Sequence, residues 1–116
     1  MQFSFLNILN NARYALNEKY PMNNENKRLR IRATAQGTEK DRLVRVSFHD
    51  YGTGIPNKIL DKITHPFFST KPTGMGTGLG LSISHDIIDE HGGNLSIESR
   101  DGEFTQINVD LPPVVM

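Results

Sequence analysis

Asparagines interrupt an apolar segment near the start of the chain, where they could bind a metal ion. Asn7, Asn10 and Asn11 lie within five residues of one another. Asparagine is a mediocre helix former because its amide competes for backbone groups. Asn7 and Asn11 are four residues apart and would share one face of a helix. An amide oxygen suits Mg²⁺ alongside phosphate oxygens, although a solvated helix face explains the same spacing.

A carboxylate followed by glycines occupies positions 50–55, Asp-Tyr-Gly-Thr-Gly-Ile. Asp50 ends a hydrophobic strand pattern and can accept a hydrogen bond from an exocyclic amino group such as that of adenine. Gly52 and Gly54 allow positive φ angles and the close approach of a flat ligand. A local Asx-type turn is the alternative interpretation.

Glycine stands at every second position from Gly74 to Gly80, directly before a predicted helix. Backbone N–H groups in such a loop, together with a helix N-terminus, favour anions. No strand directly precedes the loop and no Gly-Lys-Ser/Thr follows it, which excludes the Rossmann and Walker A patterns. A merely flexible loop is the alternative.

An aromatic pair precedes a lysine in positions 65–71, His-Pro-Phe-Phe-Ser-Thr-Lys. The aromatic residues could anchor a lid, and Lys71 could then reach a terminal phosphate; local packing and a solvated lysine are the alternative. The four histidines show no shared metal-ligand spacing, and we interpret them as structural or surface residues.

The elements that position these residues follow from hydrophobic periodicity. Helical spacing predicts helices over 1–18, over a short stretch from Pro56 to Ile63, and over 79–91, the last ended by the Gly92-Gly93 pair. Alternation predicts strands over 29–35, 43–49, 95–99 and 105–111. The first strand is expected to be half-buried, with arginines on its outer face. This order predicts a two-layer α+β sandwich.

Composition limits the possible functions. The chain has 116 residues, with 13 Lys+Arg balancing 13 Asp+Glu, so its charge gives no argument for nucleic-acid binding. The absence of cysteine excludes disulfides and thiolate chemistry. No apolar run approaches the ~18–20 residues that span a bilayer. One domain covering 1–116 is therefore expected.

Together the motifs resemble the catalytic ATP-binding (HATPase_c) domain of sensor histidine kinases, within the GHKL group of ATPases. The resemblance covers most of positions 5–112 and rests on four segments in the family's order: the N box at 7–12, the G1 box at 50–55, the F box at 66–71 and the G2 box at 76–83. It implies the Bergerat ATP-binding fold, a two-layer α/β sandwich with a mixed sheet and helices on one face.

The same resemblance implies the site residues. Asn11 would bind Mg²⁺, Asp50 would bind the adenine amino group, and residues from about Pro56 to Gly78 would form the ATP lid. The residues implied as catalytic are Asn7, Asn11 and Lys71. Those implied to bind ATP are Asn11, Asp50, Gly52, Gly54, Ile55, Phe68, Lys71, Gly76, Thr77, Gly78, Leu79, Gly80, Leu81 and Thr105.

Departures from the family pattern refine the expected activity. Asn7 stands where the ATPase branches carry a glutamate that activates water, which favours phosphoryl transfer over hydrolysis. Phe104 stands where a glycine often precedes the threonine. Only positions 72–75 separate the F and G2 boxes, so the lid is expected to be short.

The expected function is a catalytic fragment of a two-component sensor histidine kinase, using ATP and Mg²⁺. No histidine of the chain has a phosphoacceptor context, so the acceptor is expected on a dimerisation domain outside the fragment. A response-regulator receiver domain is the second expected partner, with no nucleic acid and no direct membrane contact. We expect a cytoplasmic domain, whether or not the full protein is anchored in a membrane. The alternatives are a GHKL ATPase or anti-sigma serine kinase, and a degenerate interaction module.

Overall fold

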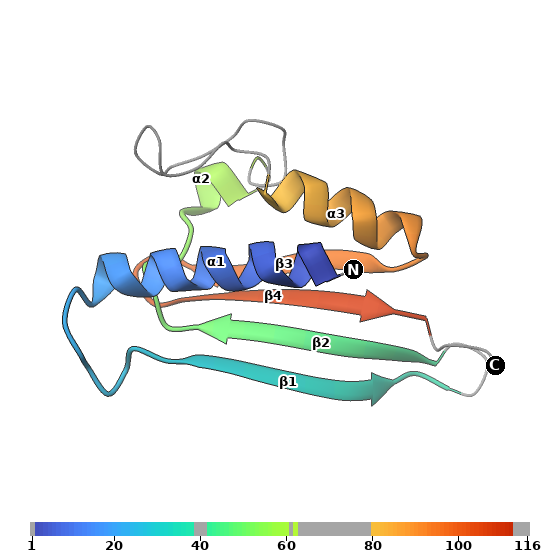
Figure 1. Cartoon of the computed structure of the whole chain (residues 1–116), viewed down its shortest axis with the longest axis horizontal. Helices are drawn as coiled ribbons and strands as arrows, with labels where there is room; N and C mark the ends of the chain where they lie inside the picture. Colours follow the sequence, from blue (N-terminus) through green and yellow to red (C-terminus); the bar gives the residue numbers. More distant parts are fainter. Residues whose placement is uncertain (1, 39–41, 61, 63–79, 113–116) are drawn as a thin grey trace.

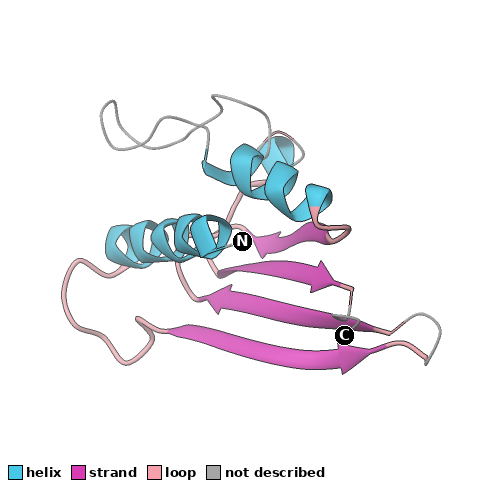
Figure 2. Cartoon of the chain, turned by 45° about the vertical axis from the view of Figure 1, so that its right-hand side comes forward, coloured by secondary structure: helices cyan, strands magenta, loops and turns pink. Residues whose placement is uncertain are grey.

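Helices and strands form two separate layers in the structure (Figures 1 and 2). The computed structural model describes residues 2–38, 42–60, 62 and 80–112. Its helices are α1 (Gln2–Lys19), α2 (Asn57–Leu60) and α3 (Gly80–Glu90). Its strands are β1 (Leu29–Gln36), β2 (Leu43–Asp50), β3 (Asn94–Arg100) and β4 (Phe104–Leu111). The helices lie on one face of the sheet, which confirms the predicted two-layer α+β architecture.

The described strands form one sheet in the order β1-β2-β4-β3. All three pairings are antiparallel, so the mixed character implied by the resemblance is not seen among the described strands. Short connections explain the β1–β2 and β3–β4 pairs, because a parallel pair needs a crossover of a dozen or more residues. Gly102, with φ of 80°, closes the β3–β4 hairpin.

The core lies between the helix layer and the central strands. Ile8, Ile88 and Val109 are fully buried there, contributed by α1, α3 and β4. The rings of Phe5 and Phe48 join α1 to β2, with centroids 5.5 Å apart. The helical spacing recognised in the sequence therefore identified the buried face of α1 correctly.

The first strand is more exposed than its alternating pattern predicts. Ile31 is 55% exposed, and Ala33 and Ala35 are exposed as well. β1 is at the edge of the sheet, whereas α1 packs over β2 and α3 over β3 (Figure 2). The expectation of a half-buried strand is therefore wrong over most of β1, because alternation identifies the apolar face of a strand but not whether anything covers it.

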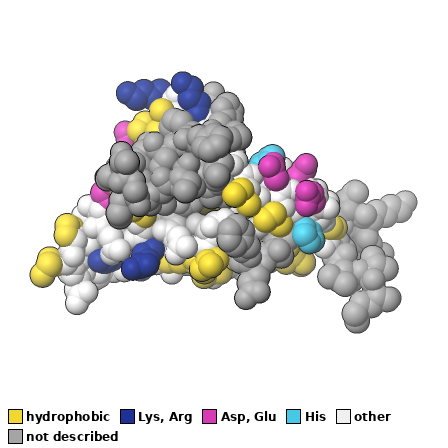
Figure 3. Space-filling model, turned by 45° about the horizontal axis from the view of Figure 1, so that its top comes forward, with side chains coloured by type: hydrophobic (Ala, Val, Ile, Leu, Met, Phe, Trp, Pro, Cys, Tyr) yellow, Lys and Arg dark blue, Asp and Glu magenta, His cyan; other side chains and the backbone are white. Residues whose placement is uncertain are grey.

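The third helix ends where the glycine pair predicts. Gly92 has φ of 75°, and its N–H donates to the carbonyl of Asp89 at 3.0 Å, while the N–H of Gly93 donates to that of Ile88 at 2.9 Å. These two bonds satisfy carbonyls that a helix end otherwise leaves open. The outer face of α3 carries exposed acidic side chains, and acidic residues and histidines gather on this side of the molecule (Figure 3). The exposed acidic residues are Asp86, Asp89 and Glu90.

Candidate functional site

Polar side chains form a row across three strands at one end of the sheet. Asp50 at the end of β2 lies opposite Thr105 of β4, and Thr105 lies opposite Ser99 of β3. Asp50 and Thr105 are 5% and 7% exposed, respectively. Side chains alternate between the faces of a strand, and the row shares the face of Phe48 and Ile107, which packs against the helices. A buried polar row beneath a helix layer needs hydrogen-bond partners.

Asp50 is the most perturbed acid among the described residues. Its Oδ1 accepts a hydrogen bond from the backbone N–H of Gly52 at 2.9 Å. Burial raises the pKa of Asp50 from 3.8 to about 6, against the opposing effects of the Gly52 hydrogen bond and of nearby His49 and Lys19. An ionised carboxylate has about four acceptor positions, and the Gly52 bond occupies one. The site therefore keeps acceptor capacity for an N–H donor.

The glycines after Asp50 let the chain pass close to two other segments. A Cβ at Gly52 would stand 2.8 Å from the backbone of Ala15 in α1. A Cβ at Gly54, where φ is 69°, would overlap the carbonyl of Arg100. The predicted positive φ is therefore found at Gly54 and not at Gly52. Both glycines allow a close approach, but the neighbours they approach are parts of this chain.

The loop over 51–55 is fastened to the β3–β4 turn. Gly102 donates its N–H to the carbonyl of Thr53 at 2.7 Å, and Lys19 Nζ donates to the carbonyl of Gly102 at 2.7 Å. Ile55 donates its N–H to Ser99 Oγ at 2.7 Å. One hydrogen-bonded unit thus combines the end of α1, the loop after β2 and the β3–β4 turn.

The asparagine helix lies beside this unit. Asn7 and Asn11 are half-buried in α1, and Asn11 precedes Ala15, the residue against which Gly52 packs, by one helical turn. Gly80 and Leu81 begin α3, so the end of the glycine-rich segment that the structure describes is a helix N-terminus. Other implied ligand residues lie outside the described residues: Phe68, Lys71, Gly76, Thr77, Gly78 and Leu79.

The structure therefore brings Asp50, Gly52, Gly54, Ile55 and Thr105 together at one end of the sheet. Sequence reasoning missed two residues that hold them there. Ser99 and Lys19 carry no motif of their own. Only strand register, which puts Ser99 opposite Thr105 across a tight turn, could have indicated the first of them.

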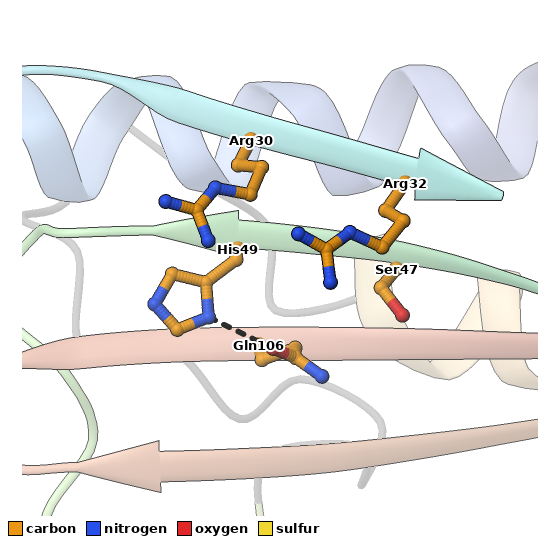
Figure 4. Close-up of a pocket in the computed structure, with 5 residues that line it drawn as sticks. All are labelled: Arg30, Arg32, Ser47, His49 and Gln106. Carbon is orange, nitrogen blue, oxygen red and sulfur yellow. Dashed lines mark hydrogen bonds between the residues drawn. The ribbon is translucent and has the colours of Figure 1, made fainter.

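The open face of the sheet carries a separate basic pocket (Figure 4). It has a volume of about 90 Å³ and is lined by Arg30, Arg32, Ser47, His49 and Gln106. His49 Nδ1 lies 2.8 Å from Gln106 Oε1. Both arginine side chains extend from β1 across β2. The basic outer face predicted for the first strand is confirmed, and it faces away from Asp50 because His49 and Asp50 are consecutive in β2.

The described residues contain neither a cluster of metal-ligating side chains nor a membrane-spanning helix. Among the described residues, no three or more His, Cys, Asp or Glu side chains are grouped so that they could hold a metal ion. The resemblance implies that Mg²⁺ would be held by the Asn11 amide together with phosphate oxygens, and this set fits the preference of Mg²⁺ for oxygen ligands. None of the described helices is long and apolar enough to cross a membrane.

Comparison with known proteins gives the family. The model of the histidine kinase-, DNA gyrase B- and HSP90-like ATPases matches residues 2–115. The chain belongs to this family, and the fold and the recognised motifs agree with it.

Individual relatives are sensor kinases from several bacteria. The chain is similar to the two-component sensor PprA of Pseudomonas aeruginosa, with 39% identity over 107 residues, which is 92% of this chain and 11% of the relative. It is also similar to the sensor histidine kinase ZraS of Escherichia coli, with 41% identity over 69 residues, covering 60% and 14% of the two chains. Sporulation kinase A of Bacillus subtilis is 39% identical over 75 residues, covering 65% and 12%. The chain thus spans only a small part of each of these relatives.

Proposed function

We propose that this chain, as a single domain over 1–116, is the catalytic domain of a two-component sensor histidine kinase. It binds Mg²⁺-ATP and transfers the γ-phosphoryl group to a histidine on a separate dimerisation domain. The observation that carries the proposal is the buried Asp50–Thr105 pair at the end of the sheet. Gly52, two residues after Asp50, packs against Ala15, which follows Asn11 by one helical turn. Family membership and the sensor-kinase names of the relatives support the proposal.

The base of the nucleotide is recognised at the Asp50 end. The carboxylate accepts a hydrogen bond from the exocyclic amino group of adenine, and the loop over 51–55 supplies the surface beside the ring. Because Asp50 is only 5% exposed, this charge-assisted bond forms with little competition from water. Asp50 must be ionised to accept fully, which its pKa of about 6 permits at neutral pH.

The phosphates are held at the start of α3. Gly80 and Leu81 offer backbone N–H groups where the helix dipole is positive. The amide oxygen of Asn11 ligates Mg²⁺, which when bound neutralises phosphate charge. Lys71 and residues 76–79 contact the phosphates and Phe68 anchors the lid, as the resemblance implies. These residues act by positioning and electrostatics, as in other phosphoryl transfers.

The acceptor and later partners lie outside this chain. A dimerisation domain of the same kinase supplies the histidine, and a response-regulator receiver domain takes the phosphoryl group next. The similarity of the chain to sensor kinases supports both partners. Within a longer protein, the domain works in the cytoplasm, where ATP is available.

A hydrolytic ATPase is the second candidate, because the family includes ATPases. Asn7 disfavours it, since a neutral amide cannot serve as the general base that activates water, and loss of such a base costs ~10²–10⁴-fold in rate. A mere interaction module would retain no need for a buried acid at Asp50.

Labelling with γ-labelled ATP tests the proposal. The purified chain is incubated with Mg²⁺, with and without a histidine-bearing dimerisation domain, and Asn11→Ala serves as the metal-site variant. Acid-labile, base-stable label in the added domain alone, lost with Asn11→Ala, is expected. Rapid phosphate release by the chain alone, abolished by Asn11→Ala, would instead assign it to the ATPases, and no ATP binding at all would leave only the interaction module.

A further inference from the structure

Ser99 occupies a position that no recognised motif contains, although three segments of the candidate site converge on its hydroxyl. We propose that Ser99 is a positioning residue that sets base selectivity by orienting the Thr105 hydroxyl and holding the loop over 51–55. The inference rests on the proposed nucleotide-binding function. It concerns which base the site prefers.

The hydroxyl of Ser99 has a fully determined set of hydrogen bonds. Ser99 Oγ lies 2.7 Å from the backbone nitrogen of Ile55, 2.7 Å from the carbonyl oxygen of Phe104 and 3.1 Å from Thr105 Oγ1. A hydroxyl has one proton and two lone pairs. A carbonyl oxygen can only accept, so the Ser99 proton goes to Phe104. The N–H of Ile55 and the hydroxyl of Thr105 then donate to the two lone pairs.

This assignment makes the Thr105 hydroxyl the donor in its hydrogen bond with Ser99. Its proton points along the sheet toward β3, so its lone pairs remain for a ligand. Asp50 lies opposite Thr105 on its other side, in β2, and a carboxylate is also an acceptor. The row therefore offers acceptors next to each other. They match the amino group at C6 of adenine, whereas guanine bound in the same orientation would present its C6 keto oxygen to oxygen lone pairs.

Ser99 also fastens the loop that carries the site. The hydrogen bond from Ile55 to Ser99 joins the loop to β3. Two residues earlier in the loop, the carbonyl of Thr53 accepts from the N–H of Gly102 in the β3–β4 turn. Removing the hydroxyl leaves the N–H of Ile55 and the carbonyl of Phe104 without this partner, and it frees the Thr105 proton to rotate. Losing these partners and freeing the Thr105 proton both weaken adenine binding. The free Thr105 proton also weakens the discrimination between adenine and guanine.

The test compares dissociation constants of ADP and GDP, measured by calorimetric titration. Ser99→Ala is expected to weaken ADP binding about tenfold, which is the scale of one hydrogen bond whose loss leaves groups unpaired. It should also bring the dissociation constants of ADP and GDP closer together. Ser99→Thr keeps the hydroxyl and should retain both values within about threefold. Ser47→Ala is the matched control: it removes the same atom from a hydrogen bond of 2.8 Å to Asn108 on the open face, and it should change neither value.

The outcomes separate this inference from the proposed function. ADP binding by the unmodified chain, with affinity and selectivity unchanged in Ser99→Ala, would overturn the inference alone. No ADP binding by the unmodified chain would overturn the proposed function and the inference with it. If Ser99→Ala fails to fold, Thr105→Val decides instead, because it keeps Ser99 and removes only the hydroxyl that Ser99 is proposed to orient. An unchanged ratio of the ADP and GDP dissociation constants in that variant would also overturn the inference.

Discussion

The two faces of the sheet differ in how their polar side chains are paired. On the open face, polar residues of β2 are paired with the residue directly opposite in β4: Arg45 with Asp110, Ser47 with Asn108 and His49 with Gln106. On the helix face, Asp50 is buried and its pKa is raised to about 6. On the open face, polar side chains are hydrogen-bonded to one another across the strands. On the helix face, the ionised form of Asp50 is destabilised by burial.

The difference indicates where function lies. Arg45 contacts Asp110 through two hydrogen bonds, of 2.6 and 2.9 Å, and the resulting pair raises the pKa of Arg45 through its bond to Asp110. Such a pair favours the folded chain. A buried acid that is desolvated more than it is compensated has the opposite effect, and perturbed acids of this kind are found preferentially at functional sites.

Substituting Asp50 and Asp110 should therefore change the free energy of unfolding in opposite directions. The largest effect expected is that of Asp50→Asn on ADP binding. Asp50→Asn is expected to weaken ADP binding by about 1.5–3 kcal/mol, because the amino group of adenine loses a charged acceptor. In the apo chain at pH 7, the same change should raise the free energy of unfolding by about 2 kcal/mol, since it removes a carboxylate that is costly to bury. Calorimetry and urea denaturation measure the two quantities.

Asp110→Asn on the open face is the matched control for this comparison. It should lower the free energy of unfolding by about 1 kcal/mol, since the Arg45 side chain is 33% exposed and solvent screens the pair. ADP affinity should not change. Equal effects of the two substitutions on ADP binding would contradict the division between the faces.

Acidification should reproduce part of the Asp50→Asn effect. The folded pKa of about 6 exceeds the ordinary 3.8. The stability contributed by the protonated carboxyl is therefore fully present below about pH 3.8 and is lost as the pH rises through about 6. ADP binding has the opposite dependence, because it needs the ionised form.

Lowering the pH from 7 to 5 should accordingly weaken ADP binding by up to about tenfold in the unmodified chain. Titrations with Asp50→Asn at the same pH values correct for other titrating groups. A pH dependence that persists undiminished in Asp50→Asn would assign it to a different group.

How far the sequence predicts this molecule differs between the faces as well. Motifs singled out Asp50, Gly52 and Gly54, because few residue types provide the backbone or acceptor properties of these positions; their role in binding ATP stays a prediction. Helical spacing likewise identified the buried side of α1. These features are local, and the chain carries them in consecutive positions.

Features that depend on register and coverage were missed. Ser99 belongs to the candidate site only because β3 and β4 align it with Thr105. The residues next to Ser99 in the sequence give no indication of this alignment. Ile31 lies in the strand that was expected to be half-buried, because alternation cannot tell which strand is at the edge, beyond the reach of the helices. Tertiary placement decides both cases.

The smallest expected effect comes from the basic pocket on the open face. Arg30 and Arg32 are exposed, and both lie on the face opposite to Asp50. Exposed charges contribute little to stability, because water and salt screen them. We therefore expect Arg30→Gln and Arg32→Gln each to change the free energy of unfolding by less than about 0.5 kcal/mol, measured by urea denaturation.

ADP affinity should stay the same in both variants within about twofold. The described contacts join neither side chain to the row formed by Asp50, Thr105 and Ser99, although the guanidinium of Arg30 lies 5.9 Å from the centroid of the Tyr51 ring in the neighbouring loop. Long-range attraction between exposed charges and a phosphate is screened within about 8 Å at physiological salt. Ser47→Ala, in the floor of the same pocket, provides a neutral comparison. A loss of ADP affinity with either arginine variant that vanishes at high salt would show that the open face steers the nucleotide electrostatically. The two faces would then act together in binding, and the division between them would hold for stability alone.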